Sequence, residues 1–239
     1  MFVMLGIKSN FGFAKAVNRG VSLAQNNYFL FLNPDVFLSK TTIEVMWKFL
    51  TKAKYRGITG CKVINGKKKL VQKTVVNPLS LFKVIIEFTS LKKVFHFFGF
   101  KNFSRFWNYK VLNAKNVCQV YMISGCFMFC SRDIFDKVGG FDEKFFLYLE
   151  DLDFCIRVNK LGYKIFYNPH ALVKHIEGES SRSSPYRINE IFWDKSKRYF
   201  CKKWFGFSGY VLNYLFDLDD YFVKIKKYFS KVTLCIFLQ

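Results

Sequence analysis

Residues 28–35 read Tyr-Phe-Leu-Phe-Leu-Asn-Pro-Asp, and this stretch decides the expected fold. Residues 28–32 form a continuous apolar run of strand length, which is typical of a parallel strand covered on both faces. The run ends at Asn33, Pro34 and Asp35, so a carboxylate directly follows a buried strand. Open α/β sheets bind ligands at that edge, and a carboxylate there can hold a divalent cation. Asn-Pro-Asp is also an ordinary turn sequence, so the stretch alone leaves both interpretations open.

The segments on either side of this strand predict an alternation of strands and helices. Residues 2–7 are rich in strand formers, and apolar residues then recur at helical spacing over residues 14–24. Thr41 or Thr42 can cap the next helix, which carries apolar residues on one side as far as Leu50. A succession of strand, helix, strand and helix predicts an α/β fold.

The rest of the chain predicts further strands and helices, with a change of architecture after residue 184. Asn65 and Gly66 favour a tight hairpin turn because both tolerate positive φ. The patterns predict strands over residues 58–64, 69–76, 117–130, 163–167 and 171–173, and helices within 79–98, 132–138 and 150–161. We therefore expect an α/β domain over residues 1–184 and a helical, basic and aromatic extension over residues 185–239.

Composition limits the classes of protein and partner. Hydrophobic residues make up 51% of the 239 residues, which excludes a disordered chain. The net charge of +21 attracts polyanions: nucleic acid, anionic lipid or a diphosphate substrate. No RNA-binding signature accompanies the charge, so we expect no nucleic acid. The basic residues alternate with aromatic ones, a pattern that favours a membrane surface, although a packed helical pair with a solvated basic face explains it equally well.

Cysteine usage and hydropathy bear on the compartment. Seven Cys without a Cys-x-x-Cys pair predict neither a zinc site nor a disulfide framework, and a reducing cytosol is the simpler account. No uncharged apolar run reaches the roughly 18 residues that a spanning helix needs. These observations predict a cytoplasmic protein, with peripheral attachment to the inner face of the cytoplasmic membrane as its membrane contact.

A second group of acids follows a glycine-rich segment. Residues 139–143 read Gly-Gly-Phe-Asp-Glu, and residues 148–153 read Tyr-Leu-Glu-Asp-Leu-Asp. Acids at a helix start stabilise the positive end of its dipole, which would explain them without any chemistry. Glycosyl transfer with inversion, however, needs a base that takes the proton of the acceptor hydroxyl. Asp151 or Glu150 would be that base. His175 is a lone histidine at a strand end, and a lone histidine is usually structural.

Taken in order, these motifs resemble the family-two glycosyltransferases. The resemblance rests on residues 10–20, 32–35, 124–126, 139–146, 150–153 and His175, whose order and spacing are specific although each motif is weak alone. The closest branch is similar to the rhamnosyltransferase-like enzymes of bacterial surface polysaccharide synthesis. The resemblance implies a GT-A fold, a Rossmann-like mixed sheet flanked by helices that binds a nucleotide-diphosphate sugar and a divalent cation, Mg²⁺ or Mn²⁺.

The resemblance also implies roles for particular residues. Asp35 and His175 match positions at the metal, and Asp35 is the final acid of the family's Asp-x-Asp element, whose first acid is Asn33 here. Asp151 matches the catalytic base, with Glu150 beside it. The positions near the donor nucleotide are Asn10, Gly12, Asn18, Asn33 and Asp35, and those on the acceptor side are Ser124, Gly125 and Asp142. If these roles are right, the carboxyls of Asp35 and Asp151 converge on one cleft.

One departure from the family pattern concerns the N-terminus. Family members begin with a strand, a helix and a second strand whose acidic residue holds the nucleotide base, whereas this sequence starts at what corresponds to the third strand. We therefore expect a GT-A domain that lacks its first strands. The predicted function is inverting transfer of a hexose or deoxyhexose to a glycan or lipid-linked acceptor; the alternative is a non-catalytic, truncated remnant that binds membrane or glycan.

Overall fold

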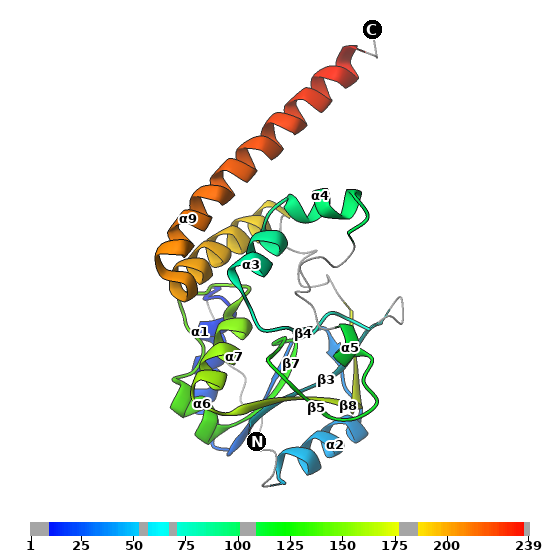
Figure 1. The fold of residues 1–239 in the computed structure, drawn as a ribbon. Coiled ribbons are helices and arrows are strands. Elements are labelled where there is room, and N and C mark those ends of the chain that lie inside the picture. The colour runs from blue at the N-terminus through cyan, green and yellow to red at the C-terminus, as the bar shows by residue number, and fades with distance from the viewer. Residues whose placement is uncertain (1–9, 53–56, 67–70, 101–108, 177–185, 237–239) are drawn as a thin grey trace. The chain divides into compact units, whose positions relative to one another are not determined.

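The fold is described from a computed structural model that covers residues 10–52, 57–66, 71–100, 109–176 and 186–236 (Figure 1). The chain forms two compact units: residues 1–78 with 107–196, and residues 79–106 with 197–239. This division differs from the boundary expected after residue 184. The segment before residue 107 joins the C-terminal helix because the Phe88 ring packs against Phe200 and Ser90 hydrogen-bonds to Asp219.

The first unit is built on a mixed, six-stranded sheet. Its order is β1 (Tyr28–Leu32), β7 (Phe127–Ser131), β3 (Gly57–Asn65), β8 (Lys164–His175) and β2 (Val36–Phe37), and β5 (Cys118–Val120) also pairs with β8. Among the described strands of this sheet, β3 and β8 are the only parallel pair, and the other pairs are antiparallel. A separate pair joins β4 (Val75–Val76) to β6 (Met122–Ile123). The α/β class and the mixed sheet are as expected.

Helices cover both faces of the main sheet (Figure 1). One side carries α1 (Phe13–Leu23), α6 (Arg132–Val138) and α7 (Glu150–Lys160), and the other carries α2 (Lys40–Leu50), while α5 (Tyr109–Leu112) is a single short turn. On β1, Phe29 and Phe31 pack toward Phe135 of α6, whereas Tyr28 packs on Trp47 of α2. Helices thus cover both faces of β1, which explains why all of its residues are apolar.

Several expected elements are corrected by long-range pairing. Within the described residues, the strand at residues 28–32, which was expected to be parallel, pairs antiparallel with β7; covering on both faces produces the same apolar run in either direction. The cap of α2 is not Thr41 or Thr42 but Ser39, whose side chain accepts a hydrogen bond from the Thr42 N–H. The strand expected over residues 117–130 is broken into β5, β6 and β7.

Two other expected strands join and one hairpin is only partly formed. Residues 163–167 and 171–173 belong to one strand, β8, whose register against β3 shifts between Cys61 and Lys62. Of the expected hairpin, the structure describes an antiparallel bridge between Ile64 and Val71, and β4 pairs with β6 instead of β3. The expected strand over residues 2–7 lies outside the described residues.

The second unit is helical. It contains α3 (Leu81–Phe88), α4 (Leu91–Phe97) and the part of α9 (Tyr186–Ile236) that begins at Lys197. α9 is interrupted at Gly206, whose φ of 53° is not helical. Arg198 pairs with Asp217 and Asp220 across the two limbs of α9. Within the described residues, we find no helix that combines the length and the apolar character needed to cross a membrane.

Candidate functional site

The first part of the site joins Asp35 to His175. Asp35 lies in the turn between β1 and β2, and Val36 of β2 is the register partner of His175 on β8. This pairing brings Asp35 Oδ1 to 3.1 Å from His175 Nε2, although 140 positions separate the two residues. Both side chains are almost buried, with 8% of the Asp35 side chain and 12% of the His175 side chain exposed. The sheet therefore holds a carboxylate and an imidazole nitrogen against each other.

Gln72 completes this group and was missed by the sequence analysis. Its Oε1 lies 2.8 Å from His175 Nδ1, and its Nε2 donates to the backbone carbonyl of His175 at 3.1 Å. The sequence offers no signal for this residue, because a single glutamine between Val71 and Lys73 has no pattern that points to a site. Gln72 and His175 are 103 positions apart in the sequence, and only the fold brings them into contact.

The chemistry of this group fits a divalent cation. Two ligands about 2.1 Å from a metal and at a right angle to each other are about 3.0 Å apart, and the observed separation of Asp35 Oδ1 and His175 Nε2 is 3.1 Å. In the part of the chain that the structure describes, no group of three or more His, Cys, Asp or Glu could hold a metal. Substrate oxygens and water would therefore fill most of the coordination shell, as is usual for Mg²⁺ at phosphate sites.

The second part of the site is centred on Asp151, at the start of α7. Its Oδ2 accepts a hydrogen bond from the Gly125 N–H at 2.8 Å, and its Oδ1 accepts one from the Leu152 N–H at 2.8 Å. A Cβ added at Gly125 would lie 3.2 Å from the Asp151 Cβ, so glycine allows this close approach. Burial raises the pKa of Asp151, and hydrogen bonds from Gly125, Leu152 and Ser124 oppose the rise. Asp151 as a whole residue is half-buried.

Glu150 lies beside Asp151 in a different environment. Only 7% of Glu150 is exposed, and within the described structure its Oε2 is buried without a hydrogen-bond partner. Burial first, and then the negative charge of Asp151, raise the pKa of Glu150 to about 8. The two adjacent carboxyls therefore differ: both oxygens of Asp151 accept backbone hydrogen bonds, whereas Oε2 of the buried Glu150 has no partner in the described structure.

The segment before α7 is held in an unusual backbone conformation. Tyr148 and Leu149 have φ values of 72° and 67°, in the left-handed region that residues other than glycine rarely adopt. The first turns of α9, which belong to the same unit, support this segment through a stacked Phe146–Phe192 pair and a hydrogen bond from the Ser196 hydroxyl to the Leu147 carbonyl. Backbone strain of this kind is found at functional sites, where the surrounding structure maintains it.

The two parts of the site meet around Cys126, the residue before β7. The Asn33 N–H donates to the Cys126 carbonyl at 3.2 Å, which ties the turn that carries Asp35 to the residue after Gly125. The pKa of the Cys126 thiol is raised to about 12, mainly by burial and further by the negative charges of Asp151 and Asp35. Both carboxylates therefore lie within electrostatic reach of one side chain, despite more than a hundred residues between them.

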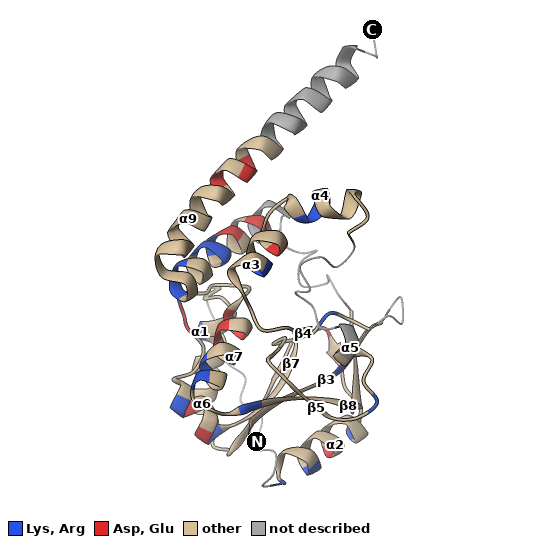
Figure 2. Cartoon of the chain, viewed as in Figure 1, with Lys and Arg blue, Asp and Glu red and all other residues tan. Residues whose placement is uncertain are grey.

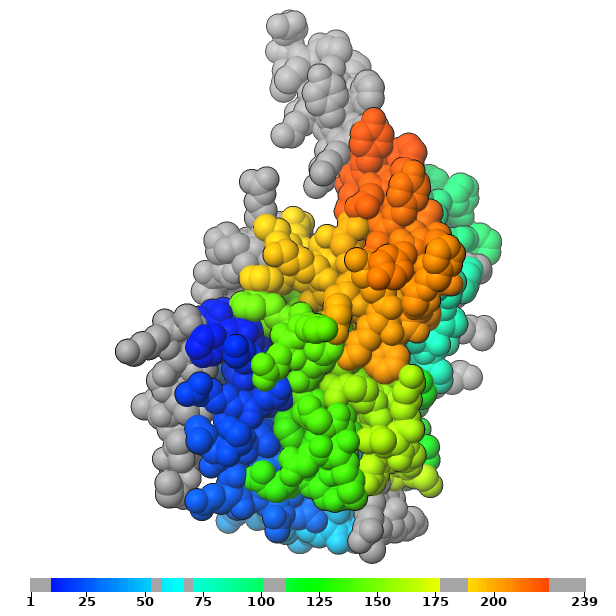
Figure 3. Space-filling model, turned by 90° about the vertical axis from the view of Figure 1, so that its left-hand side faces the viewer, coloured from blue at the N-terminus to red at the C-terminus, as the bar shows by residue number. Residues whose placement is uncertain are grey.

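The remaining predicted residues have defined structural contacts. Asn10 accepts a hydrogen bond from the Gly12 N–H at 3.0 Å, and a Cβ on Gly12 would lie 2.3 Å from the Phe146 carbonyl oxygen. Asn18 makes hydrogen bonds to both the N–H and the carbonyl of Phe141. Figure 3 shows the consequence, with the blue surface of α1 directly against the green surface that follows α6. Asp142 accepts a hydrogen bond from the Lys144 N–H at 3.0 Å.

These contacts explain the residues as parts of the scaffold, and their expected contacts with donor or acceptor stay predictions. A cavity of about 650 Å³ runs along β1, between residues of α1 and Trp47. The residues that line it include none of the predicted site residues. The site is therefore located by the carboxylates and not by this cavity.

Comparison with known proteins adds an independent observation. Residues 6–187 match the family model described as "Glycosyltransferase like family 2". The chain is 26% identical over 187 residues to the rhamnosyltransferase WbbL of Escherichia coli K12, a match that covers 77% of this chain and 62% of WbbL. It is 40% identical over 63 residues to the N-acetylglucosaminyl-diphospho-decaprenol L-rhamnosyltransferase of Mycobacterium tuberculosis, which covers 26% of this chain and 20% of that protein. The chain spans less than two thirds of the length of these relatives.

Among solved structures, GalNAc-T7 with UDP, GalNAc and Mn²⁺ is similar to this chain with a TM-score of 0.49 and 13% identity. That match covers 71% of this chain and 31% of GalNAc-T7.

Proposed function

Because the chain belongs to the glycosyltransferase-like family 2, we propose that it transfers a sugar from a nucleotide-diphosphate donor to a glycan or lipid-linked acceptor, with inversion at the anomeric carbon. The observation that carries this proposal is that the Asp35 turn and the Asp151 carboxylate are hydrogen-bonded to neighbouring residues, Cys126 and Gly125. One carboxylate has an imidazole nitrogen beside it, and the other lies at the start of α7 with backbone hydrogen bonds to both oxygens. The two halves of a displacement reaction need these two groups.

On the donor side, Asp35 and His175 would hold Mg²⁺ or Mn²⁺. Such a cation neutralises the diphosphate that leaves. Asn10, Gly12, Asn18 and Asn33 belong to the segments that would form the nucleotide side of the site. The names of the relatives favour a rhamnosyl donor and an acceptor carried on a polyprenyl diphosphate, in surface polysaccharide synthesis.

On the acceptor side, Asp151 would take the proton of the acceptor hydroxyl. The hydroxyl oxygen forms a bond to the anomeric carbon as the bond from that carbon to the diphosphate oxygen breaks, and the proton stays on Asp151. The raised pKa of Asp151 suits this role, since a base with a higher pKa holds the proton better. Ser124 and Gly125 hold the Asp151 carboxylate, and with Asp142 they would form the acceptor wall. Glu150 is too enclosed to meet the acceptor and would act through its neighbour.

Two variants and one control test this assignment. Sugar transfer is measured with nucleotide sugar, acceptor and Mn²⁺, and donor affinity is measured in parallel by calorimetry. Asp35→Ala should lose metal-dependent donor binding and transfer together, whereas Asp151→Asn should lose transfer and keep donor binding. Glu44→Gln, an exposed change on α2, should alter neither. Full turnover in both variants would refute the roles of the two carboxylates, and a wild-type chain that binds no donor would favour the non-catalytic alternative.

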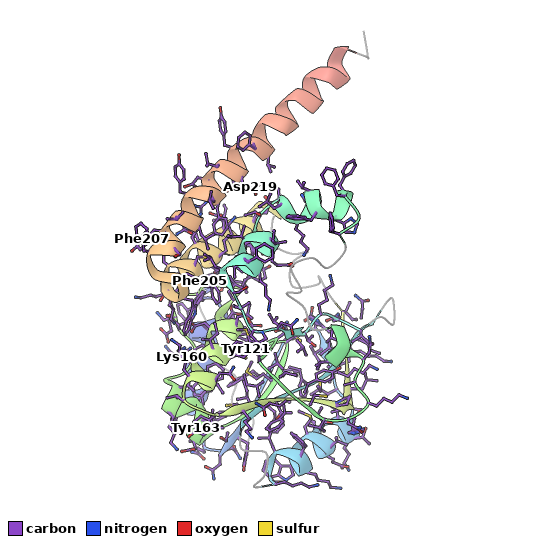
Figure 4. All side chains as sticks on the ribbon, viewed as in Figure 1. Tyr121, Lys160, Tyr163, Phe205, Phe207 and Asp219 are labelled. Atoms are coloured by element: carbon purple, nitrogen blue, oxygen red, sulfur yellow. The ribbon has the colours of Figure 1, made fainter. Side chains whose placement is uncertain are left out.

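We further propose that the second unit lies on the cytoplasmic surface of an anionic membrane. The limb of α9 after Gly206 exposes one apolar face, the aromatic stripe, made of Phe207, Tyr210, Val211, Tyr214, Leu215, Leu218, Tyr221 and Phe222. These residues recur three or four positions apart, which places them on one side of the helix. The other side is buried in the unit through Leu212 and Phe216. Phe207 is 83% exposed and projects from α9 in Figure 4.

Charge and composition favour lipid as the partner of the aromatic stripe. The Lys202 ammonium lies 5.0 Å from the ring centre of Tyr210, and basic residues are spread along the first part of α9 (Figure 2). Aromatic side chains beside lysines suit the headgroup region of an anionic bilayer. Not every aromatic residue of α9 faces outward: Tyr214 is exposed, whereas Phe200 is buried against Phe88.

Vesicle sedimentation tests the membrane proposal. The chain should bind vesicles that contain phosphatidylglycerol more strongly than vesicles of phosphatidylcholine alone, and binding should weaken with salt. Phe207→Ser with Tyr214→Ser should reduce binding severalfold, whereas Ile43→Ser, an exposed apolar change on α2, should not. Equal binding by the double variant, or a stable dimer that forms through the stripe without vesicles, would refute the proposal.

A further inference from the structure

We propose that Gln72 is a positioning residue, which fixes the tautomer and the ring orientation of His175 so that Nε2 faces Asp35 and the cation. This inference rests on the proposed function only for the presence of the cation. The contacts that carry it lie within the first unit and involve one side chain and one backbone group of His175.

The orientation of the Gln72 amide follows from its second contact. Its nitrogen lies against the backbone carbonyl of His175, which can only accept a hydrogen bond, so this position must be the NH₂ group. The oxygen of the same amide then faces Nδ1 at 2.8 Å. Because an amide oxygen only accepts, Nδ1 must carry the proton. The neutral ring therefore has its lone pair on Nε2.

The backbone around Gln72 is itself anchored on both sides. The Gln72 N–H donates to the Val63 carbonyl of β3 at 2.8 Å, and the Thr74 carbonyl accepts a hydrogen bond from the Ser124 N–H at 2.8 Å. Val63 lies on the strand that pairs with β8, and Ser124 precedes the glycine that binds Asp151. The segment that carries Gln72 thus links the donor side of the site to the acceptor side.

The tautomer matters because of what lies opposite Nε2. At 3.1 Å, Asp35 Oδ1 and the Nε2 lone pair of a neutral ring are two acceptors that face each other, so this contact is favourable when a cation lies beside both atoms or when Nε2 also carries a proton. A divalent cation accepts both lone pairs at once. In the other tautomer the Nε2–H would donate to Asp35, and the ring would be closed to a metal. Outer-sphere partners that fix a ligating histidine typically contribute about 10–100-fold to metal affinity.

Two substitutions at this position and one control test the inference. Gln72→Leu removes both contacts, Gln72→Glu keeps an acceptor for Nδ1, and Gln119→Leu alters an exposed glutamine on β5. The tautomer of His175 is read from nitrogen-15 NMR of labelled histidine without metal or substrate, and His175→Asn assigns the signal. The affinity for Mn²⁺ is read by electron paramagnetic resonance.

The expected results separate a positioning role from a merely structural one. Wild type, Gln72→Glu and Gln119→Leu should show the proton on Nδ1, while Gln72→Leu should shift it toward Nε2 and weaken Mn²⁺ binding by about 10–100-fold. If the substitutions acted only by removing packing, Gln72→Glu would not preserve the proton on Nδ1. An unchanged tautomer or an unchanged Mn²⁺ affinity in Gln72→Leu would overturn the inference. A wild-type chain that binds Mn²⁺ but transfers no sugar would refute the proposed function and leave Gln72 in its role.

Discussion

Replacing Glu150 by glutamine should change how the stability of the chain depends on pH. Glu150 is enclosed, its Oε2 has no hydrogen-bond partner in the described structure, and its pKa is raised to about 8. The folded state therefore keeps this proton at pH values where the unfolded chain has already released it. Its contribution to stability is fully present below the ordinary glutamate pKa and is lost as pH rises through the raised value.

The magnitude follows from the number of protons involved. One proton retained by the folded state alone lowers the free energy of unfolding by about 1.4 kcal/mol for each pH unit within this window. Across two units of the window, the wild type should lose roughly 3 kcal/mol relative to Glu150→Gln. Any cost of the buried amide is independent of pH and cancels from the slope.

Urea unfolding measures this difference. The free energy of unfolding of wild type and Glu150→Gln is determined by tryptophan fluorescence at several pH values between the ordinary glutamate pKa and the raised one. Glu44→Gln, an exposed substitution on α2, supplies the control and should follow the wild-type profile. Parallel profiles for wild type and Glu150→Gln would show that Glu150 titrates as an exposed acid does, and the assignment of Glu150 as an enclosed partner of Asp151 would be wrong.

Three further substitutions test the scaffold around the site, each by urea unfolding. Gly12→Ala should destabilise the fold by more than about 1 kcal/mol, because φ is 84° and the new Cβ would lie 2.3 Å from the Phe146 carbonyl oxygen; an unchanged midpoint would contradict the close approach. Asn18→Ala should cost about 2–4 kcal/mol through the loss of its amide contacts, and a purely ligand-binding asparagine would cost almost nothing. Arg157→Ala should cost about 3–5 kcal/mol because it removes the ion pair with the buried Asp153 carboxylate and the hydrogen bonds to the carbonyls of Val138 and Gly140, and wild-type stability of Arg157→Ala would mean that these contacts do not hold the start of α7.

The separation of the two adjacent acids illustrates what sequence could not decide. The pattern at residues 150 and 151 marks both as candidates for a base, and neither periodicity nor spacing distinguishes them. The structure does, because Gly125 and Leu152 donate to Asp151 while Glu150 turns into the interior. Burial depends on which segments pack over a helix start, and those segments come from elsewhere in the chain.

The limits of the charge pattern are similar. The alternation of basic and aromatic residues predicts an amphipathic C-terminal region, and α9 is helical as expected. Which aromatic residues face outward depends on the packing of α9 against α3, so Phe200 is buried while Phe207 is exposed. The sequence pattern is common to both faces of such a helix, and only the tertiary contact selects one.

The sequence by itself determined the features that depend on neighbours along the chain. Helices α1, α2, α6 and α7 begin and end within a few residues of their expected bounds, because apolar spacing and terminal glycines act locally. The strand at residues 28–32 and the acid that follows it were likewise readable.

Only the tertiary structure decided which strands pair and which side chains contact His175. An apolar run records that both faces are covered but not the direction of the neighbouring strand, so the antiparallel pairing of β1 with β7 could not be predicted from it. Gln72 reaches His175 because β3 holds its backbone and β8 presents the imidazole, a meeting of residues 103 positions apart. Contacts between residues so far apart in the sequence depend on the free energy of the whole sheet, which no local sequence pattern encodes.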